Sequence, residues 1–258
     1  MKMKVTVCQM HDDPEKFQKD WDRLSGHVRI YRSDLVLLPE MPFWPWLAWR
    51  PQFDAPLWQE AVGGHDDWIP RLTEMGQAVV LGTRPVTHES GRFNEGFVWD
   101  QGNGYRAAQA KCHLPCEEGY WEAEWYKGSD GVFNPVQTNK ALLGFSICTD
   151  LWFFRHAREY GKQGVHITVC PRATPATTLD KWLAGGQAAA VVSGAYSLSS
   201  NKVSQRSHPS DMGGRGWIID PDGEVLAVTS EHKPIISMEI DLAAAEKAKS
   251  TYPRYVRD

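Results

Sequence analysis

The chain has 258 residues, of which 42% are hydrophobic and 23% are charged, so it can bury a sizeable core and is not disordered in bulk. Its 28 Lys and Arg are offset by 32 Asp and Glu, and the net charge of −4 argues against non-specific binding to nucleic acid. No apolar run approaches the roughly 18 residues of a membrane span, and the first apolar segment is too short for a signal peptide. We therefore expect a cytoplasmic protein with neither nucleic-acid nor membrane partners, whose five cysteines are free thiols.

The first half of the chain mixes helical and strand patterns. Some segments repeat apolar residues at helical spacing, and others alternate or run uninterrupted, which predicts amphipathic helices and buried strands. Asn103–Gly104 is a strong hairpin signal between the last two of these strands. In chain order we expect a strand at 4–10, a helix at 12–31, a strand at 33–41, an irregular loop rich in Pro and Trp at 43–53, a helix at 56–77, and strands at 78–86, 95–103 and 105–114.

The second half alternates buried strands with two helices. In the longer helix, Gly185 and Gly186 predict close packing against another element. The alternation indicates two sheets faced by helices, in a single domain over residues 1–258. In chain order we expect a loop at 115–131, a strand at 141–148, a helix at 154–164, a strand at 165–170 closed by Pro171, a helix at 179–196, and strands within 197–203, 214–230 and 234–241.

Three of the expected strands end in a reactive side chain, namely Glu40, Lys111 and Cys148. A cysteine at the exit of a buried strand lies where open α/β sheets present reactive groups, although free cysteine also commonly fills a core. A thiol is a poor nucleophile until its proton is removed. A carboxylate can accept that proton, and a fixed ammonium can stabilise the thiolate and the oxyanion formed on attack. The combination predicts nucleophilic catalysis, which no one of the three residues would indicate alone.

The sequence around these three positions resembles the motifs of the carbon–nitrogen hydrolases of the nitrilase superfamily, which use a Glu–Lys–Cys triad. Glu40 stands in LVLLPEM, Lys111 in AKCHLP and Cys148 in GFSICTDLWF. The resemblance covers essentially the whole chain, because supporting phrases match in the same order. These phrases are Gln9 after the first strand, RFNEGFVWD, GRGWIIDPDGEVLA and the closing YPRY.

The resemblance implies an α/β fold, the four-layer αββα sandwich, built into homodimers or higher homo-oligomers and working without a cofactor. It implies that Glu40 is the general base, that Lys111 stabilises the oxyanion, and that Cys148 is the nucleophile that forms an acyl-enzyme. The backbone N–H of Thr149 would be a second oxyanion donor. The C-terminal tail, about residues 243–258, would lie at a subunit interface.

Many members of the family carry a further glutamate after the lysine motif, which positions the substrate and the catalytic lysine. Glu118, in CEEGYW, is the best match here, and Glu117 is its competitor. From positions close to the three motifs, we also expect a set of substrate-binding residues. These are Trp44, Trp46, Tyr120, Thr149, Trp152, Arg172 and Ala173.

The two residues after the nucleophile bear on the substrate. Nitrile-cleaving members typically follow the cysteine with Trp-Glu and carbamoyl-amide hydrolases with Asn-Asp, whereas this chain has Thr149 and Asp150. The default is therefore a small primary amide, hydrolysed to a carboxylic acid and ammonia. Cleavage of a nitrile or an N-carbamoyl amide stays open, as do acyl transfer through the same triad and a binding protein that kept the fold and lost turnover.

Aromatic residues near the triad predict an apolar acyl group. Residues 43–46 follow Glu40 closely, and residues 152–153 follow Cys148 closely, so several of their rings are expected at the substrate. Aromatic walls favour flat or apolar groups through area burial and stacking. Arg172 would call for an anionic substrate instead if its side chain reached the pocket.

Cys112, His113 and Cys116 lie close enough in the sequence to suggest zinc binding. A structural zinc site needs four ligands, and no second pair follows at a suitable spacing. We therefore expect no metal site, and we expect His113 to be a structural hydrogen-bonding residue.

Overall fold

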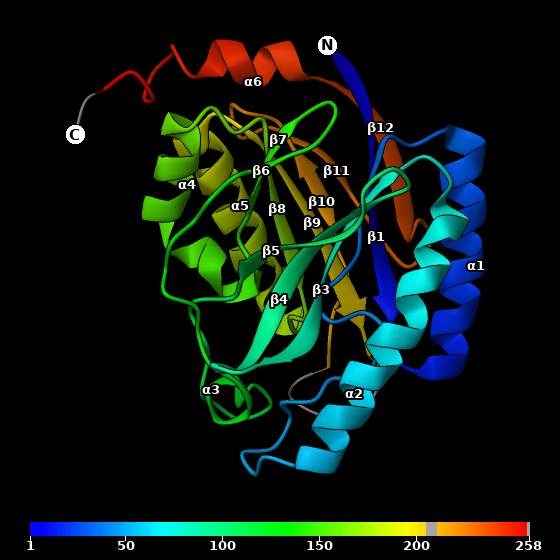
Figure 1. The fold of residues 1–258 in the computed structure, drawn as a ribbon. Coiled ribbons are helices and arrows are strands. Elements are labelled where there is room, and N and C mark those ends of the chain that lie inside the picture. The colour runs from blue at the N-terminus through cyan, green and yellow to red at the C-terminus, as the bar shows by residue number, and fades with distance from the viewer. Residues whose placement is uncertain (205–210, 257–258) are drawn as a thin grey trace.

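Two β-sheets pack face to face at the centre of the molecule, with a layer of helices on each outer side (Figure 1). The computed structural model describes residues 1–204 and 211–256. Hydrogen bonding connects the strands into one twelve-stranded sheet, whose halves on either side of the β1–β9 pairing have the orders β12-β1-β2-β3-β4-β5 and β6-β7-β8-β9-β10-β11. The predicted αββα arrangement is confirmed. The strands are β1 (Lys2–His11), β2 (Leu35–Leu37), β3 (Val79–His88), β4 (Gly91–Asp100), β5 (Gly104–Ala110), β6 (Val136–Gln137), β7 (Leu142–Phe145), β8 (Ile167–Arg172), β9 (Tyr196–Val203), β10 (Trp217–Ile219), β11 (Val225–Val228) and β12 (Ile235–Asp241).

Strand β1 belongs to both sheets. Its first part pairs with β12 and β2, and its last residues, Gln9 to His11, pair in parallel with β9 of the second sheet. One continuous strand therefore fixes the two sheets relative to each other.

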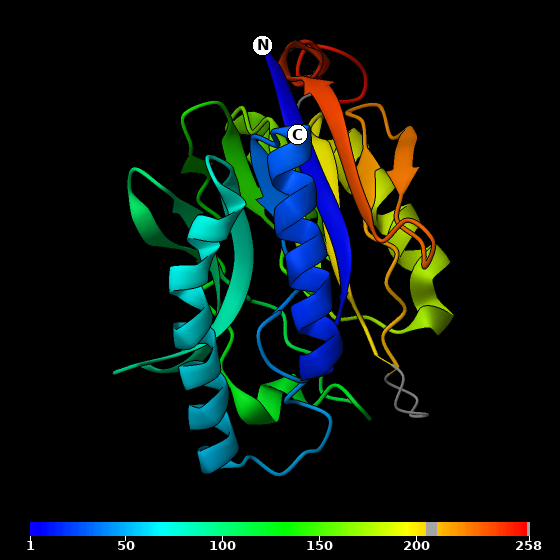
Figure 2. The same ribbon diagram turned by 90° about the vertical axis from the view of Figure 1, so that its right-hand side faces the viewer.

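The helices form the two outer layers, α1 and α2 over the first sheet and α4 and α5 over the second (Figures 1 and 2). Helix α1 begins as predicted, since the Asp13 side chain accepts a hydrogen bond from the backbone N–H of Lys16 at 3.0 Å and Pro14 stands in the first turn. The helices are α1 (Pro14–Tyr31), α2 (Ala55–Trp68), α3 (Glu122–Trp125), α4 (Phe154–Lys162), α5 (Leu179–Ser193) and α6 (Leu242–Ala248), with a 3-10 segment at Ile69–Met75 that continues α2.

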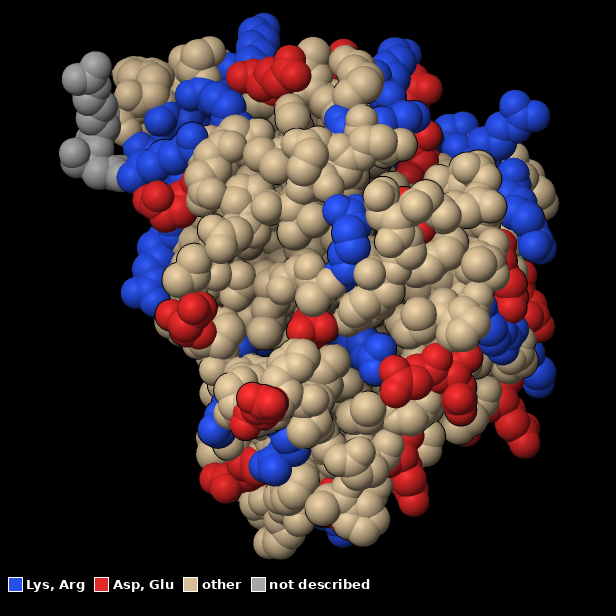
Figure 3. Space-filling model, in the orientation of Figure 1, with Lys and Arg blue, Asp and Glu red and all other residues tan. Residues whose placement is uncertain are grey.

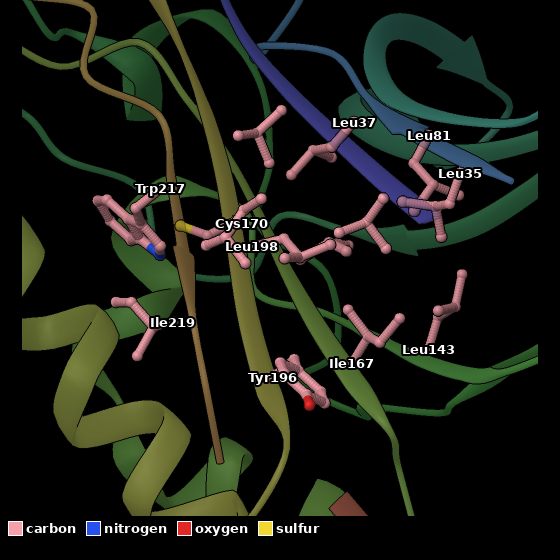
Figure 4. Packing of buried hydrophobic residues seen from close by; sticks show 14 of the residues in the cluster. Leu35, Leu37, Leu81, Leu143, Ile167, Cys170, Tyr196, Leu198, Trp217 and Ile219 are labelled. Atoms are coloured by element: carbon pink, nitrogen blue, oxygen red, sulfur yellow. The ribbon is translucent and has the colours of Figure 1, made fainter. Parts of the chain in front are cut away.

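Strand β2 shows how the alternation of side chains builds the core. Leu35 and Leu37 point between the two sheets, and Val36 and Leu38 point outward against α1. Full burial of each such side chain stabilises the fold by about 1.5–3 kcal/mol. Figure 4 shows the residues that fill the space between the sheets, among them Leu35, Leu37 and Leu81 from the first sheet and Leu143, Ile167 and Leu198 from the second.

The paired glycines of α5 allow close packing, as the sequence predicts. A Cβ atom on Gly185 would lie 2.9 Å from the Trp152 ring, and one on Gly186 would lie 2.7 Å from the Trp217 ring. A larger residue at position 185 would therefore crowd the turn that carries Cys148, and one at position 186 would crowd β10.

Several elements differ from the expected pattern. Pro171 lies inside β8 instead of ending it, because β7 stops before this position and only β9 pairs there. The short helix α3 interrupts the expected loop at 115–131. Helix α6 follows β12, where no helix was expected, with the Asp241 side chain capping its N-terminus.

The C-terminal segment packs on the helices of its own chain. The Lys249 ammonium donates to the carbonyls of Val165, Ser193 and Gly194 at 2.6–2.9 Å, and Arg158 of α4 donates to the carbonyl of Arg254 at 3.0 Å. Contact of this tail with a second subunit stays a prediction.

Charged residues of both signs are interspersed over the face in Figure 3, with uncharged surface between them. That face therefore lacks the concentrated positive charge that a nucleic acid would select. In the described part of the chain, no helix combines the length and the apolar character needed to cross a membrane.

Candidate active site

Glu40 lies just past the end of β2 and is fully buried. Its Oε1 atom accepts hydrogen bonds from the Asn94 side chain at 2.7 Å and from the Lys111 ammonium at 2.9 Å. Its Oε2 atom is also buried but has no hydrogen-bond partner among the described residues. Buried carboxylate oxygens are normally hydrogen-bonded, so Oε2 is an unusual acceptor that could still receive a proton or a hydrogen bond. Asn94, on β4, was not singled out from the sequence.

Lys111 follows β5 directly and is held between two carboxylates. Its ammonium is 2.9 Å from Glu40 Oε1 and 2.5 Å from Glu122 Oε2, and all three side chains are buried. Burial alone would lower the pKa of Lys111, but the Cys148 sulfur, when ionised, and the carboxylates of Glu122 and Glu40 raise it well above its usual value. Lys111 is therefore a fixed cation at any physiological pH.

The carboxylate next to Lys111 belongs to Glu122, which corrects the prediction of Glu118 with Glu117 as its competitor. Glu118 is exposed on a turn, whereas Glu122 opens α3 and is 1% exposed. The burial of Trp125 and Tyr126 turns the start of α3 inward, and the Tyr126 hydroxyl donates to Glu122. Burial raises the pKa of Glu122 to about 7, against the opposing effect of the Lys111 ammonium.

Because the pKa of Glu122 is raised in the folded protein, the stability of the fold should depend on pH. Because Glu122 binds its proton more tightly in the folded chain, it stabilises the fold below pH 4.5, and this contribution is lost as the pH rises from about 4.5 to about 7. In the wild-type protein, this loss should lower the free energy of unfolding by on the order of 2 kcal/mol across this window. We expect the decrease to be absent in Glu122→Gln. Urea unfolding at pH 5 and pH 8 measures it.

Glu118→Gln is the matched control, because it makes the same chemical change at an exposed position. It should leave the pH dependence of the wild-type protein unchanged. A pH dependence that is the same in Glu122→Gln and in the wild-type protein would contradict the environment described for Glu122.

Cys148 begins a 3-10 turn at Cys148–Trp152, just beyond β7. Its φ of 48° lies in the left-handed region, which residues other than glycine rarely adopt and which often marks functional positions. Burial raises the pKa of the Cys148 thiol well above its usual value, and the Glu40 carboxylate raises it further while the Lys111 ammonium opposes both. The thiol is therefore protonated at neutral pH and needs a proton acceptor before it can attack.

Asp150 ties the turn of Cys148 to the segment after Lys111. Its buried Oδ1 atom accepts from the backbone N–H groups of Cys112 and His113 at 3.2 and 2.8 Å, and from Nδ1 of the His113 ring at 2.8 Å. His113 is thus a structural hydrogen-bonding residue, as predicted. Asp150, to which the sequence analysis gave no structural role, thus links the turn of Cys148 to the segment that follows Lys111.

A cavity of about 240 Å³ opens over Cys148 and Glu122. Its walls come from the segment before α3, the turn of Cys148 and the start of α5. Four of the predicted substrate-binding residues line it, namely Tyr120, Thr149, Trp152 and Ala173. The sequence missed Thr174, Lys181 and Trp182, which lie on segments whose path toward Cys148 has no local signal.

Three other predicted substrate-binding residues do not line this cavity. The Trp46 ring is buried, and its N–H donates to the Gly119 carbonyl at 2.9 Å. Trp44 lines a different cavity. Arg172 is fully buried and donates to Ser199, Thr174 and the carbonyl of Arg215 at 2.7–2.8 Å, so its guanidinium serves the fold.

The αββα fold, with Glu40, Lys111 and Cys148 beyond the ends of three strands and Glu122 at the start of α3, is the arrangement expected of nitrilase-superfamily enzymes. A family model described as carbon-nitrogen hydrolase matches residues 4–250. The chain belongs to this family and is a carbon–nitrogen hydrolase of the amidase type.

Individual relatives are distant but extend along most of the chain. The 2-oxoglutaramate amidase of Paenarthrobacter nicotinovorans is 22% identical over 253 residues, covering 93% of this chain and 82% of that protein. The chloroplastic omega-amidase of Arabidopsis thaliana is 24% identical over 234 residues, and the match covers 86% of this chain and 62% of the relative. The carbon-nitrogen hydrolase structure from Helicobacter pylori G27 superposes with a TM-score of 0.84 at 19% identity, covering 99% and 94% of the two chains.

Proposed function

We propose that the protein hydrolyses a small primary amide to a carboxylic acid and ammonia through a thioester on Cys148. The proposal rests on the different environments of the two carboxylate oxygens of Glu40. One of its carboxylate oxygens is bound by Asn94 and Lys111, and the other is buried without a partner among the described residues. The free oxygen is available to take the proton that the Cys148 thiol must lose.

In the first half of the reaction, Cys148 Sγ attacks the amide carbon and its proton passes to Glu40. The carbonyl oxygen becomes an oxyanion, which the Lys111 ammonium and the Thr149 N–H stabilise. Glu40 then protonates the leaving nitrogen, and ammonia departs as the thioester forms. In the second half, Glu40 takes a proton from water, the hydroxide attacks the thioester, and the proton returns to the Cys148 thiolate as the acid leaves.

The test of the reaction is a panel of amides, nitriles and N-carbamoyl compounds, with ammonia and acid quantified separately. We expect one mole of each product per mole of amide, and a mass increase on Cys148 equal to the acyl group when the reaction is quenched early. Nitriles turning over faster than amides, or a new product when amine acceptors are added, would favour nitrile hydrolysis or acyl transfer instead.

We further propose that the acyl group carries a carboxylate. The expectation of an apolar acyl group rested partly on Trp44 and Trp46, which line no part of the cavity over Cys148. Lys181 is the only Lys or Arg among the described residues that line it, and the carboxylates of Glu117 and Glu122 line it as well. The substrate named for the Paenarthrobacter relative, 2-oxoglutaramate, is the monoamide of a dicarboxylic acid, and an anion of this kind would complement Lys181.

Lys181→Met tests this assignment. We expect the wild-type protein to prefer a dicarboxylic-acid monoamide over an arylacetamide of similar size. An exposed ion pair contributes up to about 1 kcal/mol, so Lys181→Met should lower kcat/KM for the monoamide about fivefold and leave the arylacetamide unaffected. Lys247→Met, at an exposed position on α6, is the control. A preference for the arylacetamide, or an unchanged ratio in Lys181→Met, would restore the apolar assignment.

A further inference from the structure

Thr174 brings a buried hydroxyl to the wall of the cavity over Cys148. The residue follows β8 closely, is 2% exposed and lines that cavity. Its Oγ1 atom accepts a hydrogen bond from the Arg172 guanidinium at 2.8 Å. A guanidinium only donates, so the Thr174 hydroxyl uses a lone pair in this bond and keeps its own hydrogen. Among the described residues, no acceptor is bonded to that hydrogen.

Two neighbouring hydroxyls differ from Thr174 in this respect. Ser199 Oγ accepts from Arg172 Nε at 2.7 Å and also donates to the Cys170 carbonyl at 2.6 Å. Thr178, which lines the same cavity, donates to the carbonyl of Pro175 at 3.3 Å. Buried polar groups normally make all the hydrogen bonds that their surroundings allow. We therefore expect the acceptor for Thr174 to come from the molecule that fills the cavity.

Asn201, on β9, holds the backbone of Thr174 on both sides. Its Oδ1 atom accepts from the Thr174 N–H at 2.9 Å, and its Nδ2 atom donates to the Thr174 carbonyl at 3.2 Å. Together with the bond from Arg172, these contacts fix the hydroxyl at the cavity wall before a ligand arrives. A donor that is already in place loses little conformational freedom on binding.

The charge of Arg172 acts on this hydroxyl. The guanidinium is fully buried, and its three acceptors are two hydroxyls and a carbonyl, none of them charged. Burial lowers the pKa of Arg172 to about 10, so it stays charged at neutral pH. The Glu40 carboxylate acts on it from a distance, but its ion pair is with Lys111. A hydroxyl that accepts from a cation becomes a stronger donor, because successive hydrogen bonds polarise one another.

We propose that the Thr174 hydroxyl donates to a carboxylate on the acyl group of the substrate and is the residue that makes the site select acyl groups of this kind. This inference rests on the proposed function and deepens it. A hydroxyl bonded to a carboxylate makes a short, charge-assisted hydrogen bond, whereas a methyl group in its place would leave the hydroxyl unpaired. Of the two carboxylates on the same walls, Glu122 is bonded to Lys111 and Glu117 is exposed to solvent, which screens its charge.

The experiment compares two amides of equal chain length, glutaramate, which carries a carboxylate, and pentanamide, which ends in a methyl group. Thr174→Val keeps the branched shape and removes the hydroxyl, so the ratio of kcat/KM for glutaramate to that for pentanamide should fall about tenfold or more. Thr174→Ser, which keeps a hydroxyl, should hold the ratio within about threefold of wild type. Thr178→Val is the matched control. Its ratio should stay within about twofold of wild type, because the hydroxyl lost there already has an acceptor.

Calorimetric binding of glutarate keeps this inference separate from the proposed function. If the wild-type protein hydrolyses neither amide, the proposed function fails, but the role of the hydroxyl is still tested. Thr174→Val should bind glutarate about tenfold more weakly than the wild-type protein does. Equal binding by the two proteins, or no binding by the wild-type protein, would overturn the inference.

Two kinetic results would also contradict it. One is an unchanged ratio in Thr174→Val. The other is an equal loss for both amides, which would mean that the hydroxyl only supports the fold. If Thr174→Val does not fold, Thr174→Cys takes its place, because a thiol is only a weak donor. The ratio should then fall about threefold or more, and a wild-type ratio in Thr174→Cys would count equally against the proposal.

Discussion

Cys148→Ala should reduce amide turnover to the background rate, a loss on the order of 10⁴-fold or more, while the protein stays folded. The thiol is the only protein group in the proposed reaction that forms a bond to carbon, and no neighbour can replace it. The change removes one buried sulfur atom, and alanine meets the same strain as cysteine at a φ of 48°. Turnover and circular dichroism of the same preparation measure the two parts of the prediction.

Two further cysteine variants serve as controls. Cys116 is exposed and Cys8 is buried away from the cavity over Cys148. Replacing either with alanine should leave turnover within about twofold of wild type, as surface and distant substitutions generally do. Retained activity in Cys148→Ala, or an acyl group found on another cysteine, would refute the assignment of the nucleophile.

Lys111→Met should damage both catalysis and the fold. Loss of an oxyanion donor costs about a hundredfold to a thousandfold in kcat. The change also leaves the Glu40 and Glu122 carboxylates buried together without their shared cation. Breaking such a buried ion pair typically costs about 3–5 kcal/mol of stability. Activity assays and urea unfolding at pH 8 give both quantities.

The pH dependence of this loss has a definite sign. Without the ammonium, nothing opposes the burial that already raises the pKa of Glu122, so the folded variant binds the Glu122 proton more tightly than the unfolded chain does. The stability of Lys111→Met should therefore recover as the pH falls from 8 to 5. Lys127→Met, on an exposed side chain in the same segment, should change neither quantity, and wild-type turnover in Lys111→Met would exclude the role of Lys111.

The sequence analysis identified Lys111, which follows a strand directly, and Glu40 and Cys148, which come three residues after one; the reason is geometrical. A strand fixes where its last residue lies, so Glu40, Lys111 and Cys148 could be assigned to one end of the sheets from pattern alone. Glu122 could not be assigned in this way. It is separated from β5 by an irregular segment, and a helix of four residues gives no periodic signal.

The misplaced tryptophans show a second limit. Nearness in sequence suggested that Trp44 and Trp46 lie at the substrate, but the chain reverses its course just after Glu40, where Met41 has a φ of 42°. A single left-handed residue redirects everything that follows, and no side-chain pattern marks it in advance. Lys181 was missed for the complementary reason, because it reaches the cavity from the start of α5, far along the chain.

The strand shared by both sheets has a consequence for how the chain acquires its fold. Lys2 pairs with Asp241, at the opposite end of the chain, while residues of the same strand pair with Asn201 and Lys202. Contacts between residues so distant in sequence require a large loop to close before they contribute any stability. Such topologies fold slowly, because the barrier is set by chain closure more than by local structure. During synthesis, β1 therefore cannot complete its pairing until β12 has left the ribosome.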